Sequence, residues 1–112
     1  MLRDETIARV VKFRDDRNWR QFHTPKDLAL SMSLEAAELL EIFQWSGTDL
    51  ECRDKTDRIR EELADILSSC ILMADVCGLD LDEIMNAKVD KNEAKYPVEK
   101  ARGSAAKYTE FT

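Results

Sequence analysis

The chain has 112 residues, of which 44% are hydrophobic and 36% are charged, and its formal net charge at pH 7 is −6. This composition is typical of one soluble, helix-rich domain spanning residues 1–112, and it excludes a disordered chain. The acidic balance disfavours a nucleic-acid partner, and no apolar run approaches the ~18 residues that a membrane span needs. The N-terminal stretch lacks the apolar segment of a signal peptide, so we expect a cytoplasmic protein.

The first two predicted helices are long, because the whole chain contains only three Gly and two Pro. Apolar residues recur on one side of residues 4–17, which predicts the first helix. Thr24 followed by Pro25 is a typical N-cap and first-turn pair, so the second helix should run from Pro25 to about Gln44.

The third helix should begin after the polar segment at residues 47–57 and end at Gly78, a residue typical of helix C-termini. Residues 80–96 read as a fourth helix that ends before Pro97. Residues 98–112 look like an irregular C-terminal tail, and no segment shows a convincing β pattern. The fold class is therefore predicted as all-α, a four-helix bundle.

The second helix has more apolar residues than one small bundle can cover. They reach around more than one of its faces: Leu28, Leu30, Met32, Leu34, Leu39, Leu40, Ile42 and Phe43. We expect the surplus to pack against a second copy of the chain, so that the bundle is completed by oligomerisation as a homodimer or homotetramer.

Two acidic pairs stand out among the apolar residues of the second and third helices. Glu35 and Glu38 are three residues apart, and Glu62 and Asp65 repeat that spacing, so each pair shares one helical face. Like charges at this spacing weaken an isolated helix by a few tenths of a kcal/mol, and partial burial costs more. Carboxylate oxygens at this density suit Mg²⁺ or Mn²⁺.

The alternative is that these acids are solvated, as most glutamates on helices are. A single E-x-x-E pattern is common, but two pairs in the two most apolar helices favour a metal site. A di-iron site would require Glu-x-x-His motifs, and the only histidine, His23, lies in a predicted loop. The sequence also lacks a Gly-rich phosphate loop and a Ser/His/Asp grouping.

The acid pairs and their flanks resemble the MazG-like superfamily of all-α nucleoside triphosphate pyrophosphohydrolases, and within it the dCTP pyrophosphatase branch. The resemblance covers nearly the whole chain, in the order RNWRQFHTPKDL, LEAAELLEIFQW, EELADIL, KVDKNEAKYP and ARGSAAKYTE. It implies a single MazG-like domain that hydrolyses a nucleoside triphosphate to the monophosphate and pyrophosphate.

The resemblance implies that Glu35, Glu38, Glu62 and Asp65 bind Mg²⁺, with Mn²⁺ as a possible substitute. Bound ions would neutralise the phosphates and polarise the α–β linkage. Either Glu38 or Glu35 would orient or deprotonate the attacking water, and the sequence leaves that choice open.

Phosphate and sugar contacts are implied for the fourth helix and the tail. The family's K-x-D-x-N-x-x-(K/R)-Y-P stretch matches this chain, and the implied contacts are Lys88, Asn92, Lys95 and Tyr96 in the helix and Arg102, Lys107 and Tyr108 in the tail. The alternative is an exposed, lysine-rich helix end, which the helix dipole favours without any ligand.

Trp19, His23 and Trp45 are the candidates for binding the base, because a nucleobase offers a flat face for aromatic stacking. The competing interpretation is that Trp19 caps the bundle and His23 satisfies a loop. Ser69 is a departure from the family, whose members often place Tyr four residues after the motif Asp. The third helix therefore has no ring at this position to contact the sugar or base.

The resemblance, together with the acidic pairs, therefore implies a Mg²⁺-dependent nucleotide pyrophosphohydrolase that acts on a dCTP-like substrate in nucleotide-pool housekeeping. One alternative is a non-catalytic helical dimerisation module with solvated acids. The other is the same scaffold acting on a different nucleotide, such as dUTP or an oxidised dNTP.

Overall fold

A computed structural model describes residues 2–111, and every regular element within that range is helical. The all-α prediction is confirmed. The chain divides into two compact units, one from the N-terminus to Gly78 and one from Leu79 onward. None of the helices in the described residues combines the length and the apolar character that spanning a bilayer requires.

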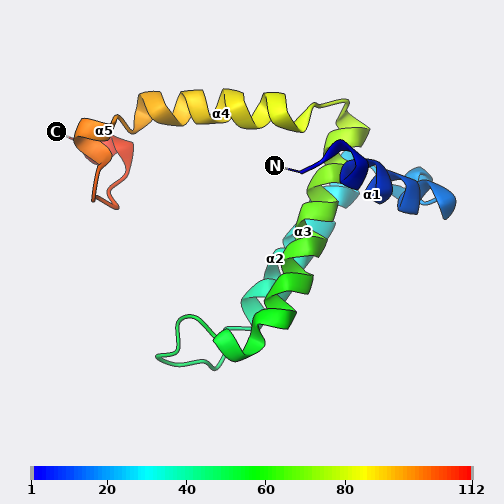
Figure 1. The fold of residues 1–112 in the computed structure, drawn as a ribbon, viewed down its shortest axis with the longest axis horizontal. Helices are drawn as coiled ribbons and strands as arrows, with labels where there is room; N and C mark the ends of the chain where they lie inside the picture. Colours follow the sequence, from blue (N-terminus) through cyan, green and yellow to red (C-terminus); the bar gives the residue numbers. More distant parts are fainter. Residues whose placement is uncertain (1, 112) are drawn as a thin grey trace. The chain divides into compact units, whose positions relative to one another are not determined.

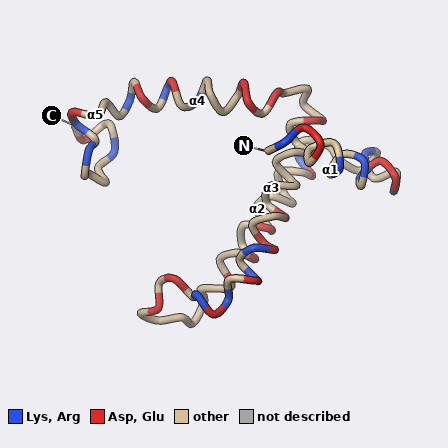
Figure 2. The backbone as a smooth tube through the Cα atoms, viewed as in Figure 1, with Lys and Arg blue, Asp and Glu red and all other residues tan. Residues whose placement is uncertain are grey.

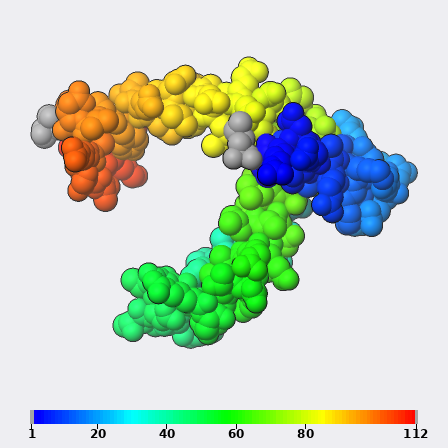
Figure 3. All heavy atoms as spheres, in the orientation of Figure 1, coloured from blue at the N-terminus to red at the C-terminus, as the bar shows by residue number. Residues whose placement is uncertain are grey.

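The first unit contains α1 (Asp4–Asp16), α2 (Pro25–Glu41) and α3 (Thr56–Cys77). Helices α2 and α3 lie side by side as an antiparallel hairpin, joined by residues 42–55 (Figure 1). Helix α1 packs on α3, against its last turns (Figure 3). The hairpin thus holds one face of α2 against one face of α3 over several turns.

Local sequence signals explain where these helices begin and end. The Thr24 hydroxyl accepts a hydrogen bond from the Asp27 amide at 3.1 Å, and Pro25 occupies the first turn of α2. Gly78 ends α3 in the left-handed conformation, with φ +67°.

Helix α2 ends at Glu41, three residues before the predicted Gln44. The next amides bond to carbonyls only three residues back, from Ile42 to Leu39 and from Phe43 to Leu40. The chain therefore leaves the α-helix in tighter turns. Trp45 follows these turns in the left-handed conformation, with φ +77°.

The core of the first unit is small. Its buried apolar residues come from α2, α3 and the connection between them, and are Leu28, Ile42, Cys52, Ile71 and Ala74. An ion pair joins α1 to α3, with Arg14 Nη1 2.6 Å from Asp75 Oδ2. Many large apolar side chains remain exposed on α2 and α3.

The second unit contains α4 (Leu81–Lys95), the short helix α5 (Val98–Ala101) and a 3₁₀ turn, η3 (Tyr108–Glu110). The first turn of α4 is acidic, and basic and acidic residues alternate only from Lys88 onward (Figure 2). The segment predicted as an irregular tail is therefore partly helical. Tyr96 explains this order, because its ring packs edge-on against Tyr108 and Phe111, with ring centroids 5.8 and 5.7 Å away.

Gly78→Ala should destabilise the protein by about 1 kcal/mol, because a Cβ is unfavourable at φ +67° although no atom lies within 4 Å to clash with it. Gly78→Asn should cost less, since Asn adopts the left-handed conformation more readily. Urea unfolding of both variants measures the difference. Equal stabilities for wild type and Gly78→Ala would contradict this account of the end of α3.

Candidate metal centre and adjoining cavity

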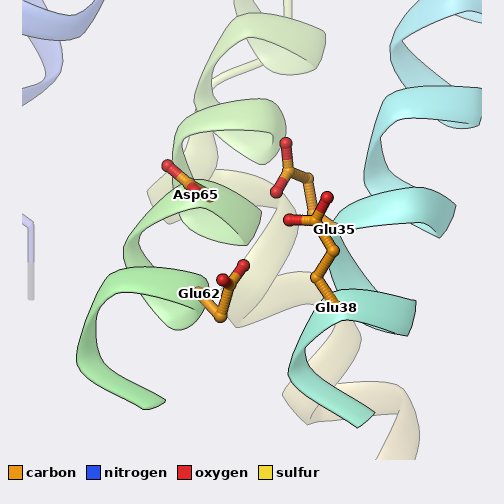
Figure 4. Close-up of side chains that lie close together, drawn as sticks. All are labelled: Glu35, Glu38, Glu62 and Asp65. Carbon is orange, nitrogen blue, oxygen red and sulfur yellow. The ribbon is translucent and has the colours of Figure 1, made fainter. Parts of the chain in front are cut away.

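The four predicted metal-binding acids come together between α2 and α3. Helix α2 contributes Glu35 and Glu38, and helix α3 contributes Glu62 and Asp65, so that two acids from each helix converge (Figure 4). One oxygen from each carboxylate lies within 4.8 Å of one oxygen from every other. The three-residue spacing read from the sequence thus places both pairs on the facing sides of the hairpin.

These carboxylates repel one another in partly buried surroundings. Burial raises the pKa of Glu35 above its ordinary value, and the charges of Glu38, Asp65 and Glu62 raise it further. The pKa of Glu62 is raised in the same way, first by burial and then by a hydrogen bond with Glu38 and the neighbouring charges. Without a bound cation, the folded protein therefore holds protons on Glu35 and Glu62 more tightly than the unfolded chain does.

The cluster also has oxygens without partners. Within residues 2–111, Glu35 Oε2 and Glu62 Oε2 are buried and accept no hydrogen bond. Buried polar atoms are normally paired, so each unpaired oxygen marks an unmet requirement for a donor or a cation. Four convergent oxygen ligands fit a hard divalent cation such as Mg²⁺ or Mn²⁺.

A cavity of about 560 Å³ lies between α1 and α3 and adjoins the acidic cluster. Its apolar walls come from Val10, Phe13, Trp19 and Leu72, and its polar lining from Thr6, Arg9, Arg14, His23, Asp65 and Ser68. Asp65 belongs to both the cavity and the cluster. A molecule in this cavity would therefore lie next to a cation held by the four acids.

Two of the three predicted base-binding residues line this cavity. Trp19 forms an edge-to-face contact with Phe13, with ring centroids 5.7 Å apart. The buried Nδ1 of His23 has no hydrogen-bond partner in the described chain, which leaves it available to a ligand. Ser69 is buried in α3, and its neighbour Ser68 lines the cavity instead.

Trp45 is not brought to that cavity within one chain. It lies beyond the end of α2 and is 94% exposed. The two tryptophans flank opposite ends of α2, and the 17 residues of this helix separate those ends by about 25 Å. Its role in binding a base stays a prediction.

The predicted phosphate and sugar contacts all lie in the second unit. Lys88 and Asn92 are exposed on α4. Lys95 Nζ lies 5.1 Å from the centre of the Tyr108 ring, so these two residues contact each other.

The remaining members of this set also lie on or beside short elements of the second unit. Tyr96 belongs to the aromatic cluster that orders the tail. Arg102 follows α5, and the Lys107 amide donates to Glu110 at 3.2 Å. The phosphate-binding roles of these residues stay predictions.

Sequence reasoning missed Arg14 as a residue of the cavity. The available signal was its spacing, since Ile7, Val10 and Arg14 fall on one face of the first helix at intervals of three and four residues. A charged residue within an apolar stripe needs a partner of opposite charge. That partner, Asp75, is 61 residues away and was not evident from the sequence.

The model of the MazG-like family matches residues 30–111. The chain belongs to the MazG-like family. Among curated proteins, this MazG-like chain is 39% identical to human dCTP pyrophosphatase 1 over 115 residues and 38% identical to the bovine protein over 113. Each alignment covers 96% of the chain and about two-thirds of the relative, 66% and 67% respectively. The chain therefore belongs to the branch that contains the dCTP pyrophosphatases.

The fold is also similar to a solved structure. The crystal structure of a pyrophosphatase from Archaeoglobus fulgidus matches with a TM-score of 0.77 and 42% sequence identity. The match covers 84% of this chain and 91% of the archaeal chain. The MazG-like assignment thus rests on both sequence and structure.

The metal-free protein should lose stability as the pH rises from the ordinary glutamate pKa through the raised values of Glu35 and Glu62. In that window the folded cluster retains protons that the unfolded chain has already released, so raising the pH favours unfolding. Mg²⁺ should restore the melting temperature at neutral pH, because it binds only the folded cluster.

Melting curves of wild type and Glu35→Gln, with and without Mg²⁺, check this expectation. Glu35→Gln should flatten the decrease with pH and weaken the response to Mg²⁺. Glu61→Gln is the matched control, since Glu61 is exposed and lies outside the cluster. A wild-type melting temperature that responds neither to pH in this window nor to Mg²⁺ would contradict a metal centre.

Proposed function

We propose that the chain is a Mg²⁺-dependent nucleoside triphosphate pyrophosphohydrolase, with dCTP or a closely related dNTP as substrate and a role in nucleotide-pool housekeeping in the cytoplasm. The reaction converts the triphosphate and water to the monophosphate and pyrophosphate. The observation that carries the proposal is the four-carboxylate cluster between α2 and α3, with a cavity of base-binding character beside it. The dCTP pyrophosphatases among the relatives support the choice of substrate.

The acidic cluster is suited to hold a cation rather than a phosphate. A triphosphate and four carboxylates would repel each other directly. Mg²⁺, or Mn²⁺ in its place, would be held by Glu35, Glu38, Glu62 and Asp65. When bound, the ion neutralises phosphate charge and polarises the α–β linkage.

The residues of the chain then have separate tasks. Glu38 or Glu35 orients the attacking water and accepts its proton on a carboxylate oxygen. The water oxygen forms a new bond to the α- or β-phosphorus as the bridging P–O bond breaks, which separates the monophosphate from pyrophosphate. Trp19 stacks on the base, His23 offers Nδ1 to a polar atom of the substrate, and the position of both in one cavity supports this assignment.

The second unit supplies cations and hydrogen-bond donors for the phosphates and the sugar. On α4 these are Lys88, Asn92 and Lys95, and beyond its end they are Tyr96, Arg102, Lys107 and Tyr108. This assignment is supported by the match of the MazG-like family model, which extends to residue 111 and so includes the whole set.

Purified protein with Mg²⁺ should release pyrophosphate from dCTP, and a panel with dUTP and an oxidised dNTP should define the base preference. Glu38→Gln and Asp65→Asn should each reduce kcat by about 100-fold or more, because each removes a ligand or the base. Glu61→Gln should retain activity. If wild type turned over no nucleotide, the enzyme assignment would fail in favour of a non-catalytic dimerisation module.

We also propose that the protein is a homodimer or homotetramer. Leu30 and Leu34 form an exposed stripe on α2, and Leu63 and Leu67 form another on α3, with Leu34 67% exposed. Monomeric proteins rarely expose contiguous apolar surface of this kind, so these stripes fit the interface with a second copy. Trp45, at 94% exposure, would gain contacts in the same way.

Light scattering at micromolar concentration should report a dimer or tetramer. Leu30→Glu should weaken the association by about tenfold or more, because it places a charge in an apolar interface. Lys26→Glu is the matched control, one turn earlier on α2 and exposed. A monomeric wild type at this concentration would overturn the proposed assembly.

A further inference from the structure

Arg14 is the least exposed charged residue in the described chain, with 2% of its surface exposed. It lies on α1 in the wall of the cavity that Trp19 and His23 also line. A guanidinium group has five N–H donors. Nε donates to Asp15 at 2.9 Å and Nη1 donates to Asp75 at 2.6 Å.

The remaining donors of Arg14 have no acceptor among residues 2–111. Both partner carboxylates lie toward the outside, since the side chains of Asp75 and Asp15 are 38% and 51% exposed. Arg14 therefore lies between an outer pair of acceptors and the cavity. Because Arg14 lines the cavity, these donors are free to bind an acceptor atom of a molecule held there.

The cavity is also suited to a flat ligand. Val10, Phe13 and Trp19 provide apolar and aromatic walls, and the buried Nδ1 of His23 has no hydrogen-bond partner in the described chain. A planar ring that carries acceptor atoms on one edge would satisfy both the walls and Arg14. A nucleobase has this chemistry.

We propose that Arg14 is a specificity-determining residue that reads the base, by donating from its guanidinium group to the adjacent O2 and N3 acceptors of cytosine. The inference rests on the proposed function, because it assigns the cavity to the base of the substrate. Uracil and thymine carry a proton on N3, which would meet an Arg14 donor with another donor. Arg14 thus favours cytosine, because O2 and N3 of that base both accept hydrogen bonds. It disfavours uracil, because the N3–H of uracil and an N–H of Arg14 would face each other without an acceptor.

The two aspartates explain how Arg14 can select between bases that differ so little. Hydrogen bonds from two different nitrogens fix the plane of the guanidinium group, so its free donors are aligned before a ligand binds. Arg9 provides the contrast within the same cavity. It also lies on α1, but it is exposed, and no hydrogen bond or ion pair holds its side chain in the described structure.

The competing explanation is that Arg14 only joins α1 to α3 through Asp75. Two conservative variants separate the explanations. Arg14→Lys keeps a positive charge for Asp75 but loses the planar fork of donors. Asp75→Asn removes the charge of the link between the helices, but the Asn amide oxygen can still accept the Nη1 hydrogen bond that aligns the guanidinium group.

The experiment measures kcat/KM for dCTP and dUTP in wild type, Arg14→Lys, Asp75→Asn and Arg9→Met. Calorimetry with dCMP and dUMP in the absence of metal provides a binding readout that does not depend on turnover. Arg14→Lys should reduce the preference for the cytosine nucleotide by about tenfold in both measurements, as expected for the loss of a bidentate base contact. Asp75→Asn and Arg9→Met should largely retain the preference, even where Asp75→Asn lowers the melting temperature.

The inference is overturned if wild type shows no preference for cytosine over uracil, or if Arg14→Lys retains that preference while folded by circular dichroism. It is also overturned if Asp75→Asn loses the preference to the same extent as Arg14→Lys, since the helix link would then explain the effect. Absence of turnover with every nucleotide would instead contradict the proposed function, and the metal-free binding measurements would still test Arg14.

Discussion

The repulsion among four carboxylates is the constraint on which the rest of this structure depends. Apolar packing holds α2 against α3, and the same packing brings Glu35 and Glu38 against Glu62 and Asp65. The helices cannot separate the charges without exposing their apolar contacts to water. Relief must come either from protons, as the raised pKa values of Glu35 and Glu62 indicate, or from a divalent cation.

With helix α1, the site has two parts, the acidic cluster and the cavity beside it. Helix α1 packs on α3 and encloses this cavity, whose lining includes Asp65, so the acids and the cavity share one residue. The ion pair between Arg14 and Asp75 holds α1 in that position, and the Arg14 carbonyl also accepts the amide of Trp19 at 3.1 Å. One residue therefore connects the helix packing, the aromatic wall and the polar edge of the cavity.

Much of the fold could be predicted because its signals are local. Thr24 with Pro25 and the left-handed Gly78 act within a few residues of where they lie, and the structure places helix ends at both. The acidic site was also predictable, because a spacing of three residues on each of two helices determines which faces carry charge. The comparisons then identified the family to which that pattern belongs.

The features that the sequence did not reveal depend on contacts between distant residues. In the sequence, Arg14 does not differ from the other basic residues of the first helix. Its special position depends on the contact with Asp75, 61 residues away. The tail was predicted to be irregular because it has no periodic apolar pattern. Its order comes instead from the packing of Tyr108 and Phe111 on Tyr96.

The central claim is that the four carboxylates bind a divalent cation, which offsets their mutual repulsion. The most direct test is Mn²⁺ binding, measured by electron paramagnetic resonance in the absence of nucleotide. Wild type should remove Mn²⁺ from the free pool saturably, and Mg²⁺ should compete. A double variant with Glu35→Gln and Glu62→Gln should lose most of that binding, because it removes one ligand from each helix and two of the four charges. Undiminished Mn²⁺ binding by the folded double variant would contradict the account.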